Sequence, residues 1–313
     1  AGAADILAAL ASIYWQTGKS KKARISLQSA SHLLADLGEQ SRAAEMQCRL
    51  ADLYFQEGRF KEALELYDRS IAALRKGNPN LASQVLCHIS QCQLEEGDWI
   101  AAEDHLQRAI ALMERHGDSA SLARALLLLA GIHQKQGLLE EALQCSRECL
   151  KIREGSMDWS GSAEALSCMA SICSERRNWS EAIDCFQKAA DLFMENGDDS
   201  SAAEALSNLG GVYHLKGDLD IALDLHYQAI EIFYRLGDMQ GTIAVWSNIG
   251  LVYQSKGDLQ SAQEFFEKSI AGKEELGDEL GAAGIRLSLG QIFHLRGEWD
   301  MAQTCFEKAA RVF

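Results

Sequence analysis

Residues 210–222 read GGVYHLKGDLDIA, and the spacing within this stretch decides the fold. A small residue, Gly210, is followed after three positions by the aromatic Tyr213, then after four by Gly217 and after five by Ala222. The glycine position recurs at residues 18, 58, 97, 137, 217, 257 and 297, and Arg177 replaces it in one copy. Copies about 40 residues apart along the whole chain predict a repeat array, whose function lies on a surface that many repeats share.

The composition favours an all-α protein and disfavours several partners. The 313 residues include one proline, the strongest helix breaker, and 47% are apolar. The 45 acidic and 30 basic side chains give a net charge of -15. We therefore expect neither nucleic acid nor an anionic membrane surface as the partner, and a neutral to basic protein segment fits better.

The cysteines and the absence of targeting signals indicate a cytoplasmic protein. Nine cysteines are an odd number without a disulfide framework spacing, which predicts buried thiols in a reducing compartment. No stretch approaches 18 consecutive apolar residues, and the first residues lack the pattern of a signal peptide. We expect no membrane-spanning segment.

One copy of the pattern predicts a helical hairpin. Apolar side chains from Leu206 to Tyr213 recur every three or four positions and mark the buried face of a first helix. Gly217 ends that helix, and Asp218 is the candidate N-cap of a second helix over about 219–235. Gly-Asp pairs at 117–118, 197–198, 237–238 and 277–278 predict the turns into the next repeats.

Two positions are small in every copy, which predicts a close helix crossing. The residue that opens the pattern is Ala11, Ala51, Ser90, Ala130, Ala170, Gly210, Gly250 or Gly290. The crossing position is alanine throughout: Ala23, Ala63, Ala102, Ala142, Ala182, Ala222, Ala262 and Ala302. A large side chain at either position would overpack the crossing, at a cost of about 1–3 kcal/mol.

This pattern resembles the tetratricopeptide repeat, in eight copies. The aromatic position holds Tyr14, Tyr54, Tyr213, Tyr253 and Phe293, but Gln93, His133 and Cys173 in the middle copies. The longer period resembles Pins-like polarity scaffolds and bacterial regulators whose repeats precede an effector. The resemblance implies a right-handed superhelix of eight helix-turn-helix repeats, with a concave groove lined by the first helix of each pair.

We expect one continuous domain over residues 1–313, cut from a longer protein because the chain starts and stops inside helices without capping segments. Uncapped ends would also permit self-association. The eight expected repeats are 3–38, 41–77, 81–117, 121–155, 161–197, 201–237, 241–277 and 281–313. The middle departs from the pattern at Arg177 and in the turn near residue 155, which a hinge, a docking point or simple sequence drift would explain.

The family fold predicts which side chains line the groove. The candidate peptide-binding residues are Trp15, Arg49, Phe55, His88, Gln91, Arg124, Gln134, Glu164, Glu204, Asn208, His214, Asn248, Gln254 and His294. Asp5, Glu45, Ser174 and Ser288 share the same face. A mixed polar lining suits an extended peptide, whose backbone N–H and C=O groups need partners when buried.

Two pairs among these residues occupy equivalent positions. Asn208 and Asn248 lie in successive repeats, and a side-chain amide can both donate to and accept from a peptide backbone; related proteins use asparagine there, although amides facing water are the alternative. His214 and His294 could confer pH sensitivity or lie on a solvated face. The lysines and arginine that clamp a carboxylate in chaperone-binding relatives are absent at these positions.

We find no pattern for catalysis, a metal or a cofactor. No Cys-x-x-Cys or His-x-x-x-His spacing occurs, and Cys145 with Cys149 reads as core filling. The segment 155–161 is expected to be a loop. Trp99, Trp179 and Trp299 each follow the glycine position by two residues and are expected to be buried at the hairpin end.

The sequence therefore predicts a non-catalytic scaffold that binds a peptide or protein segment in its groove. The alternative is a regulatory or sensor domain of a longer signalling protein, which controls an attached effector such as a protease or transcription regulator.

Overall fold

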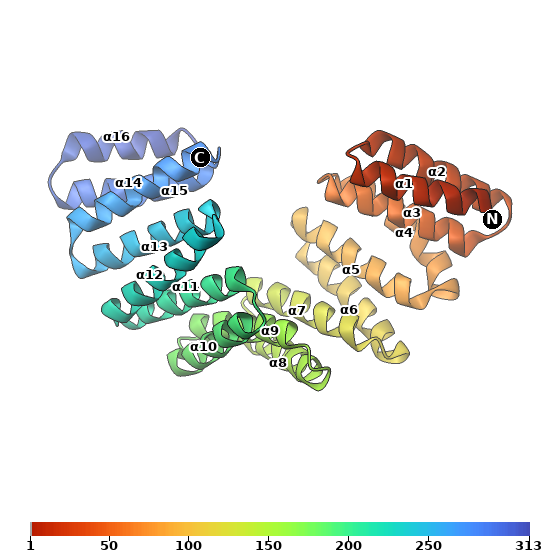
Figure 1. The fold of residues 1–313 in the computed structure, drawn as a ribbon, viewed down its shortest axis with the longest axis horizontal. Coiled ribbons are helices and arrows are strands. Elements are labelled where there is room, and N and C mark those ends of the chain that lie inside the picture. The colour runs from red at the N-terminus through yellow and green to blue at the C-terminus, as the bar shows by residue number, and fades with distance from the viewer. Residues whose placement is uncertain (1) are drawn as a thin grey trace. The chain divides into compact units, whose positions relative to one another are not determined.

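The computed structural model describes residues 2–313, which fold into α-helices without any strand (Figure 1). The helices are α1 (Gly2–Gln16), α2 (Ser20–Asp36), α3 (Gln40–Gln56), α4 (Phe60–Gly77), α5 (Pro79–Glu95), α6 (Trp99–His116), α7 (Ser119–Lys135), α8 (Leu139–Gly155), α9 (Trp159–Glu175), α10 (Trp179–Glu195), α11 (Asp199–Lys216), α12 (Leu219–Leu236), α13 (Met239–Lys256), α14 (Leu259–Glu275), α15 (Glu279–Leu295) and α16 (Trp299–Ala310). Turns of two or three residues join most of them, so consecutive helices form hairpins.

The helices belong to two compact units, one ending at Ile152 and one beginning at Arg153. In each unit a helix packs against the next one along the chain, as α3 packs on α4 and α11 on α12. First helices of neighbouring hairpins also touch, in the pairs α3 with α5, α11 with α13 and α13 with α15. The predicted all-α solenoid of helical repeats is confirmed, and a single domain over residues 1–313 stays a prediction.

The crossing alanines lie inside the hairpins, shielded from solvent. All eight are buried, and Ala222 has no exposed surface. The partner position on the first helix is equally tight, because a Cβ atom added to Gly250 would lie 2.6 Å from the ring of Phe266. At Gly210 the nearest ring atom, on His226, would lie 2.9 Å away. The prediction that large side chains would overpack this crossing agrees with these distances.

The turns between hairpins follow the predicted Gly-Asp chemistry. Asp118, Asp198, Asp238 and Asp278 each accept a hydrogen bond from the backbone N–H three residues further on, which caps the following helix. Asp218 occupies the N-cap position of α12, as predicted, but its side chain makes no capping hydrogen bond. Its carboxylate instead pairs with Lys216 Nζ at 2.6 Å.

Two residues without glycine's freedom adopt the left-handed conformation at such turns. Arg177 has φ 58° and Met157 has φ 55°. The backbone N–H of Asn178 bonds to the carbonyl of Cys173 at 2.9 Å, as that of Asp218 does to Tyr213 in the regular repeat. The backbone at these turns therefore has the same conformation as in the glycine-containing repeats. This conformation is strained for Arg177 and Met157, because their Cβ atoms crowd the backbone.

The segment 155–161 is largely helical, so the prediction of a loop there is wrong for most of it. Gly155 ends α8, and Trp159 begins α9. Asp158 explains the difference, because its carboxylate accepts from Gly161 N–H at 2.9 Å and so starts a helix two residues earlier than expected. Only 156–158 form the turn.

The tryptophans at the hairpin ends are a second correction. Trp99 is 39% exposed and Trp299 is 63% exposed, where the sequence predicts burial. Each begins the second helix of its hairpin, beside the turn, so that only part of the ring finds neighbours. Trp299 packs edge-on against His294 with ring centres 5.0 Å apart, and Phe60 contacts Phe55 in the same manner at 5.5 Å.

The nine cysteines are thiols and not disulfides, as the sequence predicts. Six of them are buried: Cys48, Cys87, Cys92, Cys149, Cys173 and Cys185. Within residues 2–313, no helix combines the length and the apolar character needed to span a membrane.

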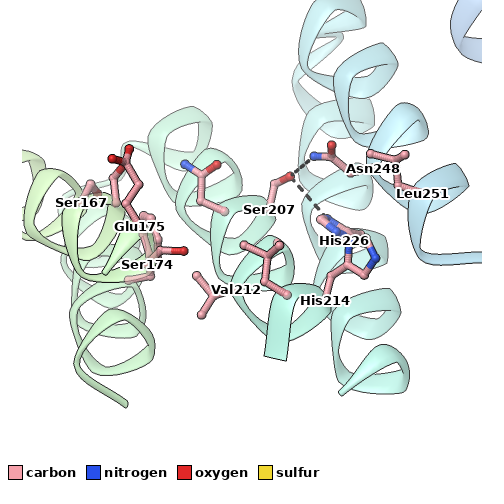
Figure 2. Close-up of a pocket in the computed structure, with 14 residues that line it drawn as sticks. Ser167, Ser174, Glu175, Ser207, Val212, His214, His226, Asn248 and Leu251 are labelled. Carbon is pink, nitrogen blue, oxygen red and sulfur yellow. Dashed lines mark hydrogen bonds between the residues drawn. The ribbon is translucent and has the colours of Figure 1, made fainter. Parts of the chain in front are cut away.

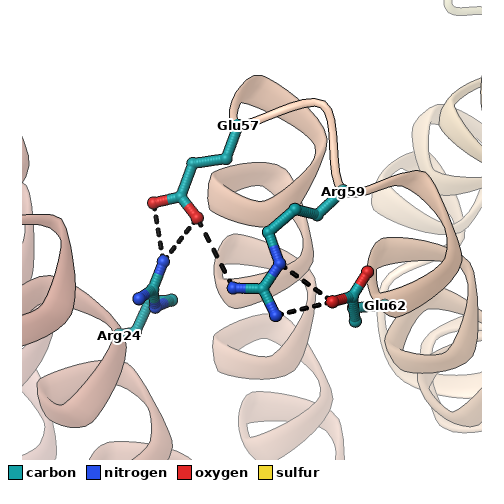
Figure 3. Close-up of polar contacts among 4 residues, drawn as sticks. All are labelled: Arg24, Glu57, Arg59 and Glu62. Atoms are coloured by element: carbon teal, nitrogen blue, oxygen red, sulfur yellow. Dashed lines mark hydrogen bonds and ion pairs between the residues drawn. The ribbon is translucent and has the colours of Figure 1, made fainter.

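A polar clasp joins neighbouring hairpins of the first unit (Figure 3). Arg24 of α2 donates to both carboxylate oxygens of Glu57, which follows α3. Arg59 lies within 3.8 Å of the same carboxylate and donates to Glu62 at 2.5 Å. Both guanidinium groups also lie over the ring of Tyr54, at 5.5 Å and 4.5 Å from its centre. The clasp therefore places two cationic groups against the face of this aromatic ring.

The same register supplies a clasp elsewhere with different chemistry. In three repeats the residue after the crossing alanine bonds to the residue three positions after the aromatic position of the next repeat. Glu103 accepts from Gln136 at 3.0 Å, and Gln263 accepts from Arg296 at 2.6 Å. In the first clasp the residue after the alanine, Arg24, is instead the donor, and Glu57 is the acceptor. The repeat geometry therefore brings these two positions together whatever polar groups they carry.

Replacing Arg177 by glycine tests the strained turn. We expect Arg177→Gly to raise the free energy of unfolding by about 0.5–1 kcal/mol, because relief of the left-handed strain exceeds the added freedom of the unfolded chain. Urea unfolding followed by circular dichroism measures it. Gly217→Ala at the matching turn should change stability by a similar amount in the opposite direction. A less stable Arg177→Gly variant would contradict the assignment of strain.

The clasp predicts a salt-sensitive contribution to stability. Arg24→Ala should lower the free energy of unfolding by about 1 kcal/mol at low salt, since the two-pronged bond to Glu57 is largely shielded from solvent. The difference should shrink at about 1 M NaCl. Arg69→Ala is the control, because Arg69 is exposed and pairs only within α4. Equal effects of the two substitutions would show that the clasp adds nothing.

Candidate functional site

A polar cleft of about 400 Å³ opens in the second unit, and we call it the α11 cleft (Figure 2). Its walls come mainly from the first helices of three successive hairpins, α9, α11 and α13, and its base includes Phe186 of α10 and His226 of α12. The cleft is open because small residues line it: Ser167, Ser171, Ser174, Ser207 and Gly211. Bulkier side chains at these positions would fill the space.

A chain of polar groups crosses the base of the α11 cleft. Asn248 Nδ2 donates to Ser207 Oγ at 3.3 Å, and Ser207 Oγ lies 3.4 Å from His226 Nδ1 (Figure 2). A hydroxyl group can accept from the asparagine and still pair with a ring nitrogen, so Ser207 bridges the amide of Asn248 and Nδ1 of His226. Three helices thus meet through one hydroxyl group.

The two histidines of the cleft are neutral at physiological pH. Burial lowers the pKa of His226 to about 4, and the nearby His214 lowers it further in the same direction. Burial also lowers the pKa of His214, whose Nε2 lies 2.8 Å from Ser255 Oγ. The remaining ionisable residue of the lining is Glu175, so the cleft carries no positive charge of its own.

Asn208 presents an unused amide at the cleft. It is exposed, and its side chain makes no hydrogen bond with another residue of the part of the chain that the structure describes. Asn248 occupies the equivalent position one repeat later. Its amide nitrogen donates to Ser207, and its carbonyl oxygen remains able to accept a hydrogen bond. The two predicted asparagines therefore lie in one cleft but have different roles.

A second, smaller cleft of about 220 Å³ lies in the first unit, between α5 and α7. The predicted residues His88, Gln91 and Arg124 line it, and Arg124 is exposed. His88 lies 3.2 Å from both Asp52 and the hydroxyl of Tyr67, while Phe55 stacks on its ring at 5.9 Å. His88 is thus partly engaged within the protein.

The structure scatters the other predicted residues. Trp15 packs against the core of the first unit, Arg49 is exposed on α3, and Gln134 is half-buried on α7. Glu164 and Glu204 are exposed on α9 and α11 without lining the α11 cleft. Gln254 is half-buried on α13. The lining of the α11 cleft includes neither Gln254 nor His294.

Sequence reasoning missed His226, Ser207, Ser167 and Ser171. His226 occupies the apolar face of a second helix, where the neighbouring repeats have Phe186 and Phe266, so its position alone indicates core. The available signal was a polar ring at a position that is otherwise aromatic. No group of three or more potential ligands that could hold a metal is found within residues 2–313.

The comparisons with known proteins agree with this architecture. The tetratricopeptide repeat model matches residues 161–235 and 241–313, and the model of the MalT-like TPR region matches residues 3–192. No curated protein sequence matches the chain. The molecule is thus a protein built from helical-hairpin repeats, and it belongs to the tetratricopeptide repeat family.

Several solved structures share the fold at low sequence identity. A signal transduction ATPase of the STAND class with a tetratricopeptide repeat sensor, from Pyrococcus horikoshii, has a TM-score of 0.71 at 15% identity, covering 99% of this chain and 47% of that one. BtubC from P. vanneervenii has a TM-score of 0.60 at 22% identity, covering 67% and 89%. A Rap protein complexed with competence and sporulation factor has a TM-score of 0.64 at 13% identity, covering 100% and 98%. These likenesses concern the fold.

The buried histidine predicts a loss of stability in mild acid. Because the pKa of His226 falls from 6.5 to about 4 on folding, the unfolded chain binds the proton more readily between these values. The stabilisation by neutral His226 is complete above pH 6.5 and is lost as the pH falls towards 4, by about 3 kcal/mol in total. Urea unfolding at several pH values measures this slope.

His226→Phe is the matched control, since Phe266 fills the same position opposite Gly250. The variant should lose stability less steeply than the wild-type chain between about pH 6.5 and 4.5. Parallel pH profiles for the two proteins would rule out a buried neutral His226.

Proposed function

We propose that this chain is a non-catalytic peptide-binding domain, and that the α11 cleft holds an extended segment of a partner protein. The observation that carries the proposal is the exposed, uncommitted amide of Asn208 beside the polar chain of Ser207 and Asn248. An extended peptide must satisfy its backbone N–H and C=O groups when it leaves water. An amide can donate to one such group and accept from the next.

The charges around the cleft favour a neutral to basic ligand. Glu175 lines the cleft, and Glu164 and Glu204 are exposed on the helices that form its walls. Both cleft histidines are neutral because burial lowers their pKa values. The net charge of -15 adds long-range attraction for a positively charged segment. We therefore propose a partner segment with lysine or arginine near the bound residues.

A second candidate function is a sensor or regulatory domain within a longer signalling protein. The fold is shared with part of a STAND protein that has a tetratricopeptide repeat sensor; this chain covers 47% of that protein. It is also shared with a Rap protein solved in complex with competence and sporulation factor. In that role, occupation of the cleft would change the activity of an attached effector. Both candidates share the binding step and differ in the consequence of binding.

The thiol-rich composition leads us to propose a cytoplasmic location.

A peptide array tests the binding step. Purified protein is incubated with an array of random peptides, and the best peptide is titrated by calorimetry against the wild-type chain and Asn208→Ala. We expect about tenfold weaker binding, the loss of roughly two backbone hydrogen bonds. The free energy of unfolding should stay within about 0.5 kcal/mol, because the replaced side chain is exposed.

Gln228→Ala is the matched control, an exposed amide on α12 outside the cleft lining. It should bind the peptide like the wild-type chain. Replacing the lysines of the peptide by glutamate should weaken binding further. Unchanged affinity of Asn208→Ala, or equal binding of the acidic peptide, would refute the assignment of the cleft or of its charge preference.

A further inference from the structure

In three of the hairpins two side chains lie close together, one at the aromatic position and one 12 residues later on the second helix. In the seventh repeat these are Tyr253 and Phe265, whose rings stack with centres 5.7 Å apart. In the last repeat Phe293 and Cys305 belong to one apolar cluster. In the fourth repeat the same register holds His133 and Cys145, so the fold places a thiol against an imidazole.

Three side chains of the first unit form a relay at this position. Cys145 Sγ of α8 lies 3.9 Å from His133 Nδ1 of α7. The opposite ring nitrogen, Nε2, lies 3.4 Å from Glu103 Oε1 of α6. Glu103 is the clasp residue of its repeat, and its carboxylate also accepts from Gln107 and Gln136, each at 3.0 Å. Those amides hold the carboxylate in place beside the ring.

The surroundings determine the form of the histidine. A carboxylate at Nε2 favours the tautomer with its proton there, which leaves Nδ1 with a lone pair directed at Cys145. His133 is buried, so its ring is held by packing as well as by the carboxylate. This is the arrangement of a thiol, a base and a group that orients the base.

The other cysteines with a described environment lack this chemistry. Burial raises the pKa of Cys48, Cys87, Cys92 and Cys173 to about 12, which suppresses the reactive thiolate. Cys305 is half-buried like Cys145 and has the same register, but its facing residue is Phe293 and burial raises its pKa. Cys145 is therefore distinguished by its neighbours and not by its place in the helix.

We propose that Cys145 is a modification site of this protein, a thiol that reacts with soft carbon electrophiles with His133 as its base and Glu103 as the positioning residue. In the reaction, His133 Nδ1 takes the proton from Sγ, Sγ forms a bond to the electrophilic carbon, and the leaving group departs with its electron pair. The resulting imidazolium is stabilised by the Glu103 carboxylate.

The test compares two cysteines within one chain. The full chain is treated with iodoacetamide at about pH 7, and the alkylation of each cysteine is followed over time by peptide mass spectrometry. We expect Cys145 to react at least about tenfold faster than Cys305, which is also half-buried and shares its register. Equal rates at Cys145 and Cys305 would overturn the proposal, whatever the variants show.

Two substitutions use residues that the last two repeats themselves carry at these positions. His133→Phe introduces the residue found at Phe293, and it should slow the alkylation of Cys145 to the rate of Cys305. Glu103→Gln reproduces Gln263, keeps the side-chain shape, and should move the pH midpoint of Cys145 alkylation upward while the midpoint of Cys305 stays constant. A variant with a packing defect would instead show faster alkylation of the buried cysteines. An unchanged rate in His133→Phe, or an unchanged midpoint in Glu103→Gln, would refute the assigned roles.

Discussion

The close approach of two helices at an alanine is the contact on which the rest of this structure depends. Ala222 and its seven equivalents are buried where the helices of each hairpin cross, and the facing position is glycine, alanine or serine. At Gly250 there is no room for even a methyl group unless Phe266 moves. A fixed crossing distance in every hairpin fixes which side chains of neighbouring helices meet.

That register places polar groups as regularly as apolar ones. Arg24 with Glu57, Glu103 with Gln136, and Gln263 with Arg296 are three chemically different pairs at the same pair of positions. The α11 cleft also follows from the register, because serines and Gly211 occupy positions on α9 and α11 that face the cleft. A repeat scaffold can therefore acquire a site by substitution at positions that do not affect the crossing.

The repeat pattern was sufficient to predict the hairpins, their buried alanines and most of their turns, because these depend on contacts within about 40 residues. It failed at the tryptophans, since the periodicity of Trp299 does not reveal that one side of its ring lacks neighbours. It also treated Arg177 as a break in the pattern. The backbone there instead repeats the glycine conformation, because the surrounding hairpin determines the turn more strongly than one residue's preference.

By itself, the sequence determined the class of fold, the register of the hairpins and the face on which Asn208 and Asn248 lie, since spacing along a helix fixes direction. The tertiary structure decided which of those residues share a cleft, because that depends on side chains from several helices at once. It also decided the states of His226 and Cys145: the first is neutral because it is buried beneath Ser207, and the second faces a histidine that Glu103 orients. Burial and partner contacts between repeats have no signature in the spacing of any single repeat.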